Sequence, residues 1–250
     1  MSQPLLTLRS ISKNFGTIRA LNGANLTVSQ GLITAIVGDN GSGKSTLIKI
    51  LSGNLTPDSG TISLSGVDYP SLSISQALEL GIRTVYQDLS LDNRKNSWEN
   101  VFLGCEKMRG IFLDRSSMEK ETRTLLDRLE INIPDLSQPA AYLSGGQRQG
   151  LAIARALRMP GKILLLDEPT SAMGIREAHN TMALLQRLKK EGLTQLLISH
   201  NLHQVFDIAD RIFVMRAGRC IADVMTADSS PDEIHAMILR QENREVNHEN

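Results

Sequence analysis

The sequence predicts an α/β fold: a core with a mostly parallel sheet, an N-terminal antiparallel β subdomain and an inserted α-helical subdomain. Apolar β-like runs alternate with turns at the start of the chain and return in its last third, whereas helix signals prevail between about Ser90 and Gly150. The length of 250 residues suits one α/β unit with an insertion. We expect one domain over residues 1–240, with its core at about 1–88 and 151–240, the helical subdomain at about 89–150, and a polar tail over 241–250.

Short apolar runs mark the strands in the first part of the chain. The run Leu32 to Val37 leads directly into a glycine-rich segment. A helix over Leu47 to Leu51 follows this segment and stops at Gly53. The other strands predicted here are Leu5 to Ile11, Ala24 to Val28, Thr61 to Leu64 and Ile82 to Gln87.

The inserted segment contains the pattern of an amphipathic helix. Ser116 precedes Glu119 by three residues, a spacing that predicts a capping box at the start of a helix. Behind this pair, several apolar residues fall on one helical face. They are Met118, Leu125, Leu126 and Leu129.

The α/β pattern returns after the insertion. Ile163 to Leu166 is a continuous apolar run, as expected of a parallel strand buried on both faces. An amphipathic helix is predicted from about Ile175 to Glu191, where Gly192 ends it. The remaining elements are a strand at Gln195 to Ile198, a hairpin of Ile212 to Met215 and Cys220 to Val224 around Ala217-Gly218, and a last helix with Ser230, Pro231 and Glu233 at its cap, first and third positions.

Composition indicates which partners and structural features the protein is not expected to have. The 27 basic residues balance the 27 acidic ones, so net charge gives no reason to expect nucleic acid as a partner. Cys105 and Cys220 are the only cysteines, which suggests neither a disulfide framework nor a zinc site. The N-terminus does not have the pattern of a signal peptide, and no apolar run reaches membrane-spanning length. We therefore expect a protein that would serve a membrane from outside the bilayer.

The glycine-rich segment matches the phosphate-binding pattern GxxxxGK[ST], with a strand before it and a helix after it. Glycines let backbone N–H groups curl around phosphate oxygens, and the helix N-terminus adds partial positive charge. Lys44 is predicted to reach the β- and γ-phosphates of ATP, and the Ser45 hydroxyl to ligate Mg²⁺. The predicted nucleotide-binding residues of this loop are Gly38, Asn40, Gly41, Ser42, Gly43, Lys44, Ser45 and Thr46.

Two acidic residues follow the apolar run that ends at Leu166. A carboxylate at the carboxyl end of a buried parallel strand lies at the crevice where such sheets bind ligands. Asp167 is then placed to hold Mg²⁺, and Glu168 to orient or deprotonate an attacking water. The alternative is an acidic pair that only caps the next helix.

A third motif, Leu143-Ser144-Gly145-Gly146-Gln147, precedes a helix expected to start near Gln149. Its small residues predict a helix N-terminus with open N–H groups, which is a second anion site. One chain has no use for a second γ-phosphate site far from the first, whereas two chains arranged head to tail do. We therefore predict that Ser144, Gly145, Gly146 and Gln147 of one subunit close over the nucleotide held by Lys44 of another.

With these three motifs the sequence resembles the ABC (ATP-binding cassette) ATPases over nearly its whole length, from about Leu5 to Gln241. The resemblance implies that Phe15 stacks on adenine, that Gln87 reads the Mg²⁺ and water site, and that His200 contacts the γ-phosphate. It also implies that Ser171-Ala172 begins the loop joining the two sites, the D-loop. Taken singly, Phe15 could be a core residue, Gln87 a solvated strand end and His200 a helix cap.

One position departs from the family pattern. The usual aspartate two residues after the alanine is replaced by Gly174, which has no carboxylate for contact across the dimer. Three segments resemble the single-cassette ATPases of bacterial monosaccharide importers. They are Gly174 with the residues that follow it, Gly81 to Leu89 and Ile198 to Leu202.

This resemblance implies an ATPase that energises an importer, with sugar as the expected solute and another small solute as the alternative. The implied partners are transmembrane permease subunits, a second cassette and, indirectly, a periplasmic solute-binding protein. The implied location is peripheral, at the cytoplasmic face of the inner membrane. A non-transport ABC ATPase or an unrelated P-loop kinase or GTPase fits less well, because the chain has one cassette, balanced charge and the Ser144 loop.

The contact with the permease is expected along Asp88 to Leu103, next to Gln87. The apolar residues expected to form it are Leu89, Leu91, Trp98, Val101 and Phe102. Trp98 is the only tryptophan, and aromatic residues are favoured interface anchors. The alternative is that Trp98 fills the core of the small helical subdomain.

Overall fold

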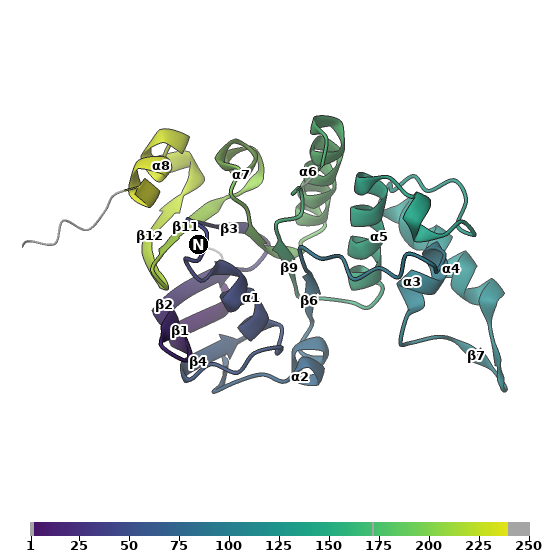
Figure 1. Ribbon diagram of the computed structural model, residues 1–250, viewed down its shortest axis with the longest axis horizontal. Coiled ribbons are helices and arrows are strands. Elements are labelled where there is room, and N and C mark those ends of the chain that lie inside the picture. Colours follow the sequence, from purple (N-terminus) through teal and green to yellow (C-terminus); the bar gives the residue numbers. More distant parts are fainter. Residues whose placement is uncertain (1–2, 172, 240–250) are drawn as a thin grey trace, which may run out of the picture.

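The computed structural model describes residues 3–171 and 173–239, and its architecture is α/β (Figure 1). A four-stranded antiparallel sheet has the order β2-β1-β4-β5. Its strands are β1 (Pro4–Phe15), β2 (Ile18–Ser29), β4 (Ser59–Leu64) and β5 (Val67–Tyr69). The predicted N-terminal antiparallel sheet is confirmed.

The central sheet has six strands in the order β12-β11-β3-β10-β9-β6. They are β3 (Ile33–Val37), β6 (Ile82–Val85), β9 (Ile163–Asp167), β10 (Thr194–Ile198), β11 (Arg211–Arg216) and β12 (Arg219–Met225). Every pairing is parallel except that of β12, which forms the predicted hairpin with β11. This strand order places the carboxyl ends of β3, β6, β9 and β10 along one edge of the sheet, where ligands bind in open α/β sheets.

Eight α-helices accompany the sheets within the described residues. They are α1 (Lys44–Leu51), α2 (Ile74–Glu79), α3 (Ser97–Phe102), α4 (Arg115–Arg128), α5 (Gly145–Leu157), α6 (Ile175–Lys190), α7 (Leu202–Ile208) and α8 (Pro231–Leu239). Shorter elements are the hairpin of β7 (Met108–Arg109) and β8 (Phe112–Leu113) and the 3₁₀ helices η1 (Ala140–Tyr142) and η2 (Thr226–Asp228). Helices α3, α4 and α5 lie together beyond the β6 edge, far from α8 (Figure 1).

Alternation along the buried strands divides the core between the two faces of the central sheet. In β9, Leu164 and Leu166 contribute to the cluster that includes α5 and α6. Ile163 and Leu165 contribute to the cluster formed with α1 and the antiparallel sheet. A strand covered on both faces has no polar side, which explains the continuous apolar run in its sequence.

The structure corrects two predicted helix starts. Helix α4 begins at Arg115, because the Asp114 side chain accepts the Ser117 N–H and caps the helix two residues before Ser116. Helix α5 begins at Gly145 and not near Gln149, because Ser144 and Gln147 form a capping box. The elements β5, α2, α3, α7 and the β7–β8 hairpin have no counterpart among the elements predicted from the sequence.

The prediction of an exposed apolar surface on α3 is wrong. Trp98 is 8% exposed, and Val101 and Phe102 are buried completely or nearly so in the helical subdomain. The alternative, that Trp98 fills this core, is the correct one. Leu89 and Leu91 are partly buried against the same core. None of the described helices combines the length and apolarity needed to cross a membrane.

Candidate functional site

The phosphate-binding loop joins β3 to α1 and is packed so closely that only glycine fits at two positions. Gly38 has φ +148°, and a Cβ there would lie 2.1 Å from the Met215 carbonyl oxygen. Gly43 has φ +103°, and its Cβ would lie 2.5 Å from the Ala20 carbonyl oxygen. The loop is therefore held between the β11–β12 hairpin and β2, with the N-terminus of α1 behind it.

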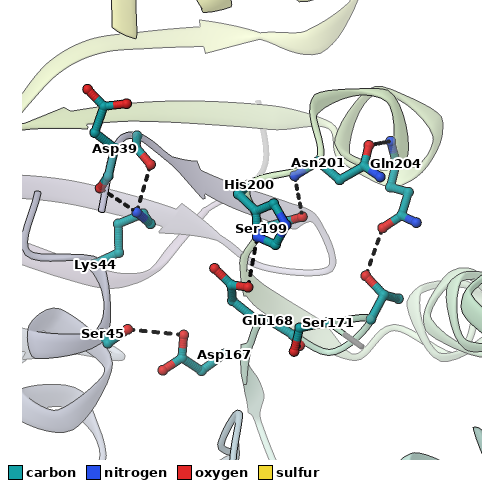
Figure 2. A network of polar contacts seen from close by, with 12 residues as sticks. Asp39, Lys44, Ser45, Asp167, Glu168, Ser171, Ser199, His200, Asn201 and Gln204 are labelled. Atoms are coloured by element: carbon teal, nitrogen blue, oxygen red, sulfur yellow. Dashed lines mark hydrogen bonds and ion pairs between the residues drawn. The ribbon is translucent and has the colours of Figure 1, made fainter. Parts of the chain in front are cut away.

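Lys44, the first residue of α1, is only 7% exposed. Its ammonium group donates to the carbonyl oxygens of Gly38 at 2.7 Å and Asp39 at 2.8 Å (Figure 2). Burial lowers the pKa of Lys44, while the negative charges of Glu168, Asp39 and Asp167 raise it. The loop thus holds a partly desolvated cation near three carboxylates.

Asp167 ends β9 and faces the start of α1. The Ser45 hydroxyl donates to Asp167 Oδ1 at 3.3 Å (Figure 2). Burial raises the pKa of Asp167, with a further contribution from the charge of Glu168, whereas the hydrogen bond from Ser45 lowers it. The arrangement brings together one carboxylate and one hydroxyl, which the sequence had placed 122 residues apart.

Glu168 has an unusual backbone that its neighbours maintain. Its φ of +51° is in the left-handed region, which costs a non-glycine residue roughly 1–2 kcal/mol. The Glu168 N–H donates to the Ile198 carbonyl at 3.0 Å, and the Glu168 carbonyl accepts both the N–H and the hydroxyl of Ser171. This conformation turns the side chain toward the carboxyl end of β10.

There the Glu168 carboxylate meets His200. Glu168 Oε2 lies 2.8 Å from His200 Nδ1, and the histidine side chain is 65% exposed (Figure 2). His200 follows β10 and does not cap α7, since Asn201 takes that role by accepting the Gln204 N–H. The pair presents a carboxylate and an imidazole side by side, which is the chemistry needed to handle a proton.

Lys44, Ser45, Glu168 and His200 open onto one cavity of about 800 Å³, whereas the predicted residues Ser42 and Asp167 are buried and do not line it. Phe15 lies at its rim at the end of β1 and is 49% exposed, so the core alternative for this residue is wrong. Gln87, two residues beyond β6, is exposed and lines the same cavity. The predicted residues that line it are Phe15, Gly38, Asn40, Gly41, Gly43, Lys44, Ser45, Thr46, Gln87, Glu168 and His200.

Sequence reasoning missed one wall of this cavity. His235, Ile238 and Leu239 of α8 line it together with the phosphate-binding loop. No motif marks them, because their position depends on how α8 packs on β11 and α7.

The Ser144 loop does not take part in this cavity. It lies at the N-terminus of α5, on the far side of α6 from the phosphate-binding loop (Figure 1). Ser144 Oγ accepts the Gln147 N–H at 3.3 Å, and Gln147 Oε1 accepts the Ser144 N–H at 2.9 Å. Gln147 also donates to the Asn132 carbonyl, so its side chain is held within its own subdomain.

Only part of the predicted D-loop can be placed. Ala172 lies outside the described residues. Ser171 closes the turn after Glu168, and Gly174 is the N-cap of α6, with no atom within 4 Å of where its Cβ would be. The absence of a side chain at this position therefore leaves open space in the single chain.

Sequence comparison relates the chain to transport ATPases. Residues 21–171 match the family model described as ABC transporter. The chain is 42% identical over 230 residues to a xylose/arabinose import ATP-binding protein of Sulfolobus acidocaldarius, covering 92% of each protein. It is 41% identical over 234 residues to a fructose import ATP-binding protein of Rhizobium meliloti, covering 90% of each.

Comparison of structures gives the same relation. A nucleotide-free ATP-binding cassette from an ABC transporter superposes with a TM-score of 0.82 at 29% identity, covering 93% of this chain and 99% of the cassette. A dimeric ATP-binding cassette bound to ADP and Pi after hydrolysis superposes with a TM-score of 0.76 at 27% identity, covering 88% of this chain and 98% of that one. The fold predicted from the sequence is confirmed.

Proposed function

The chain belongs to the ABC transporter family, and from this premise we propose that it is the ATP-hydrolysing subunit of an importer for a monosaccharide. The observation that supports this most directly is the single cavity that Lys44, Glu168, His200 and Gln87 share. The substrate class follows from relatives named for the import of xylose/arabinose and fructose, which match the chain over nearly their whole length.

Within this cavity we assign a role to each group of this chain. Lys44 offsets the charge of the phosphate being transferred, which requires it to exchange the carbonyl oxygens of Gly38 and Asp39 for phosphate oxygens. Glu168 orients and deprotonates the attacking water, and His200 holds the Glu168 carboxylate in position from its Nδ1 side. The rim residue Phe15 stacks on adenine.

The donor set fits Mg²⁺. Ser45 and Gln87 line the cavity and offer one hydroxyl and one amide oxygen, and Asp167 offers a carboxylate next to Ser45. Mg²⁺ suits such a sparse site, because it keeps several waters and takes further ligands from phosphate. When bound, the ion supplies charge neutralisation for the β- and γ-phosphates.

The second subunit supplies the other half of the site in this proposal. The residues that would reach across the interface are Ser144, Gly145, Gly146 and Gln147, which lie apart from the cavity of their own chain. A dimeric cassette among the structural neighbours supports this pairing.

Helix α5 connects this loop to the expected permease contact. Arg155, near the C-terminus of α5, donates to the carbonyl oxygens of Ser90 at 2.7 Å and Leu89 at 2.5 Å. These carbonyls belong to the segment between Gln87 and α3. We propose that the permease binds this segment, so that movement of α5 toward a nucleotide displaces it.

This function places the protein at the cytoplasmic face of the inner membrane, with a periplasmic solute-binding protein acting through the permease. From the sequence pattern we also propose that the α/β core spans about 1–88 and 151–240 and the helical subdomain about 89–150. Residues 241–250 and residue 240 lie outside the described part of the chain.

The test is recovery of the intact transporter. An affinity-tagged chain carrying Glu168→Gln, solubilised with ATP from the membranes of the cells that produce it, should bring down a permease. The recovered complex should not hydrolyse ATP. The wild-type complex in liposomes should hydrolyse ATP faster when the binding protein and a pentose or hexose are added. A complex that contains ribosomal or DNA-bound proteins in place of a permease would contradict the proposal. A wild-type transporter stimulated only by another class of solute would contradict the sugar assignment alone.

Phe15→Ala is expected to weaken ATP binding by roughly 1–3 kcal/mol, the range measured for stacking of a base on an aromatic ring. Turnover at saturating ATP should change much less, because the side chain lies at the rim and not beside Glu168. Equilibrium binding of a fluorescent ATP analogue and steady-state hydrolysis measure the two effects. Phe112→Ala, at an exposed position of the β7–β8 hairpin, is the matched control. Unchanged affinity in the folded Phe15 variant would rule out stacking.

A further inference from the structure

The Ser144 loop already has an anion beside it in the single chain. Glu177, the third residue of α6, extends its side chain across the start of α5. A Cβ added to Gly145 would lie 3.3 Å from Glu177 Oε2, and one added to Gly146 would lie 3.2 Å from the Glu177 Cβ. The two glycines of the motif therefore form the surface on which this carboxylate rests.

The pKa of this carboxyl group is lowered by the donors that it faces. The Gly146 N–H and the Ser144 hydroxyl hold the pKa of Glu177 below its ordinary value, in that order of importance, and the Gly174 N–H contributes a smaller effect. Glu177 is therefore ionised at neutral pH. The groups that lower its pKa are the same N–H and hydroxyl groups that make the start of α5 an anion site, and Glu177 lines one cavity with Ser144 and Gly146.

The cavity that Glu177 lines beside the Ser144 loop has a volume of about 360 Å³. Among the described residues that line this cavity, Arg187 is the only basic one. Arg187, however, forms an ion pair with Glu130 and donates to the Leu129 carbonyl. The negative charge of Glu177 faces two helix N-termini, that of α5 and that of its own helix α6. A phosphate group that approached the same donors would meet a like charge.

We propose that Glu177 is a resident anion of the Ser144 loop, which must leave before the nucleotide of a second subunit can enter. The proposal rests on the trans role of the Ser144 loop in the proposed function. In the separated subunit the carboxylate fills the donors at the start of α5. On closure the triphosphate displaces it, so part of the binding free energy of ATP is used to move Glu177. Glu177 thereby raises the ATP concentration that two subunits need in order to close.

The experiment compares ATP-dependent dimerisation of Glu168→Gln with that of Glu168→Gln/Glu177→Gln. The first substitution prevents turnover, and the second keeps the shape of the side chain while removing its charge. Sedimentation at increasing ATP concentration should show half-maximal dimer at about tenfold lower ATP for the double variant, a factor expected from the loss of one like-charge repulsion near a protein surface. A purely structural role for Glu177 predicts the opposite shift, because the variant would weaken the contact between α6 and the Ser144 loop that orders the loop.

Glu119→Gln in the same background is the matched control. Glu119 is exposed on α4 and lines neither the large cavity nor the one beside Ser144. Its removal changes the net charge equally and should leave the ATP requirement unchanged. A double variant that needs the same or more ATP would overturn the proposal. A Glu168→Gln chain that binds ATP and stays monomeric would contradict the trans site itself, and the proposal with it.

A second measurement tests the contact without dimerisation. In the nucleotide-free monomer, the amide resonance of Gly146 should follow the titration of a carboxyl group below the ordinary pKa of glutamate. The same resonance should be insensitive to acid in Glu177→Gln. A Gly146 amide that titrates equally in both proteins, or in neither, would overturn the proposal.

Discussion

Replacing Glu168 by glutamine should leave ATP affinity near its wild-type value and reduce steady-state hydrolysis by about 10²–10⁴-fold, the range that general base catalysis supplies. The amide keeps the shape of the side chain and can still meet His200 at the position where Oε2 now lies. It cannot accept a proton from water. Because hydrolysis is what would release two closed subunits, the variant should also accumulate as an ATP-bound dimer.

Phosphate release measured beside nucleotide affinity separates these effects. Glu119→Gln, on the exposed side of α4, is a suitable control because it removes one carboxylate outside the cavity. A Glu168→Gln enzyme with near-normal turnover would show that another group is the essential base. A folded variant that no longer binds ATP would show that Glu168 has a role in binding.

The second large effect is expected when two inactive variants are mixed. Lys44→Ala should reduce hydrolysis to background, because it removes the cation that lies against the loop carbonyls. Ser144→Arg should do the same by placing a bulky cation at the N-terminus of α5. If the Ser144 loop acts across the interface, a mixed dimer contains one doubly altered site and one site in which every residue is wild type.

Partial activity on mixing therefore supports the trans arrangement. With random pairing of a twofold-symmetric dimer, about a quarter of all sites are intact. Gly174 provides no carboxylate to join the two sites, which favours independent firing and hence visible recovery. Ser116→Arg, in the first turn of α4, controls for the added charge and should be active by itself. Crosslinked heterodimers that bind ATP at the wild-type site and do not hydrolyse it would contradict independent sites, whereas nucleotide held entirely by one chain would contradict the trans arrangement.

Local motifs predicted the fold and most of the cavity because each reflects a constraint on neighbouring residues, either close backbone packing or burial of a strand on both faces. The loop from Gly38 to Ser45 needs glycines where the backbone meets Met215 and Ala20, and these constraints leave a readable spacing in the sequence. The apolar run that ends at Asp167 reports a strand covered on both faces. Together they were enough to predict which strand ends meet, although the residue contacts themselves, such as Ser45 with Asp167, follow only from the sheet order.

The errors arose where competing local signals or tertiary packing decided the outcome. Asp114 and Ser116 are both capable caps, and the structure uses the earlier one. A lone Trp98 gives no sign of whether it is an interface anchor or a core residue, and packing within the helical subdomain buries it. The wall formed by α8 and the approach of Glu177 to Gly146 depend on how separate helices dock, which no short pattern in this sequence records.

The order of strands in the central sheet also bears on how the chain folds as it is synthesised. Strand β3, which carries the phosphate-binding loop, pairs with β10 and β11 and with no strand from the first half of the chain. Ile33 lies opposite Gln195, so β3 has no partner until more than 160 further residues have left the ribosome. Its five residues are buried in the finished sheet and are exposed to other chains until then. The helical insertion, built from nearer contacts, can form first, and the last third of the chain then closes the sheet around a strand made long before.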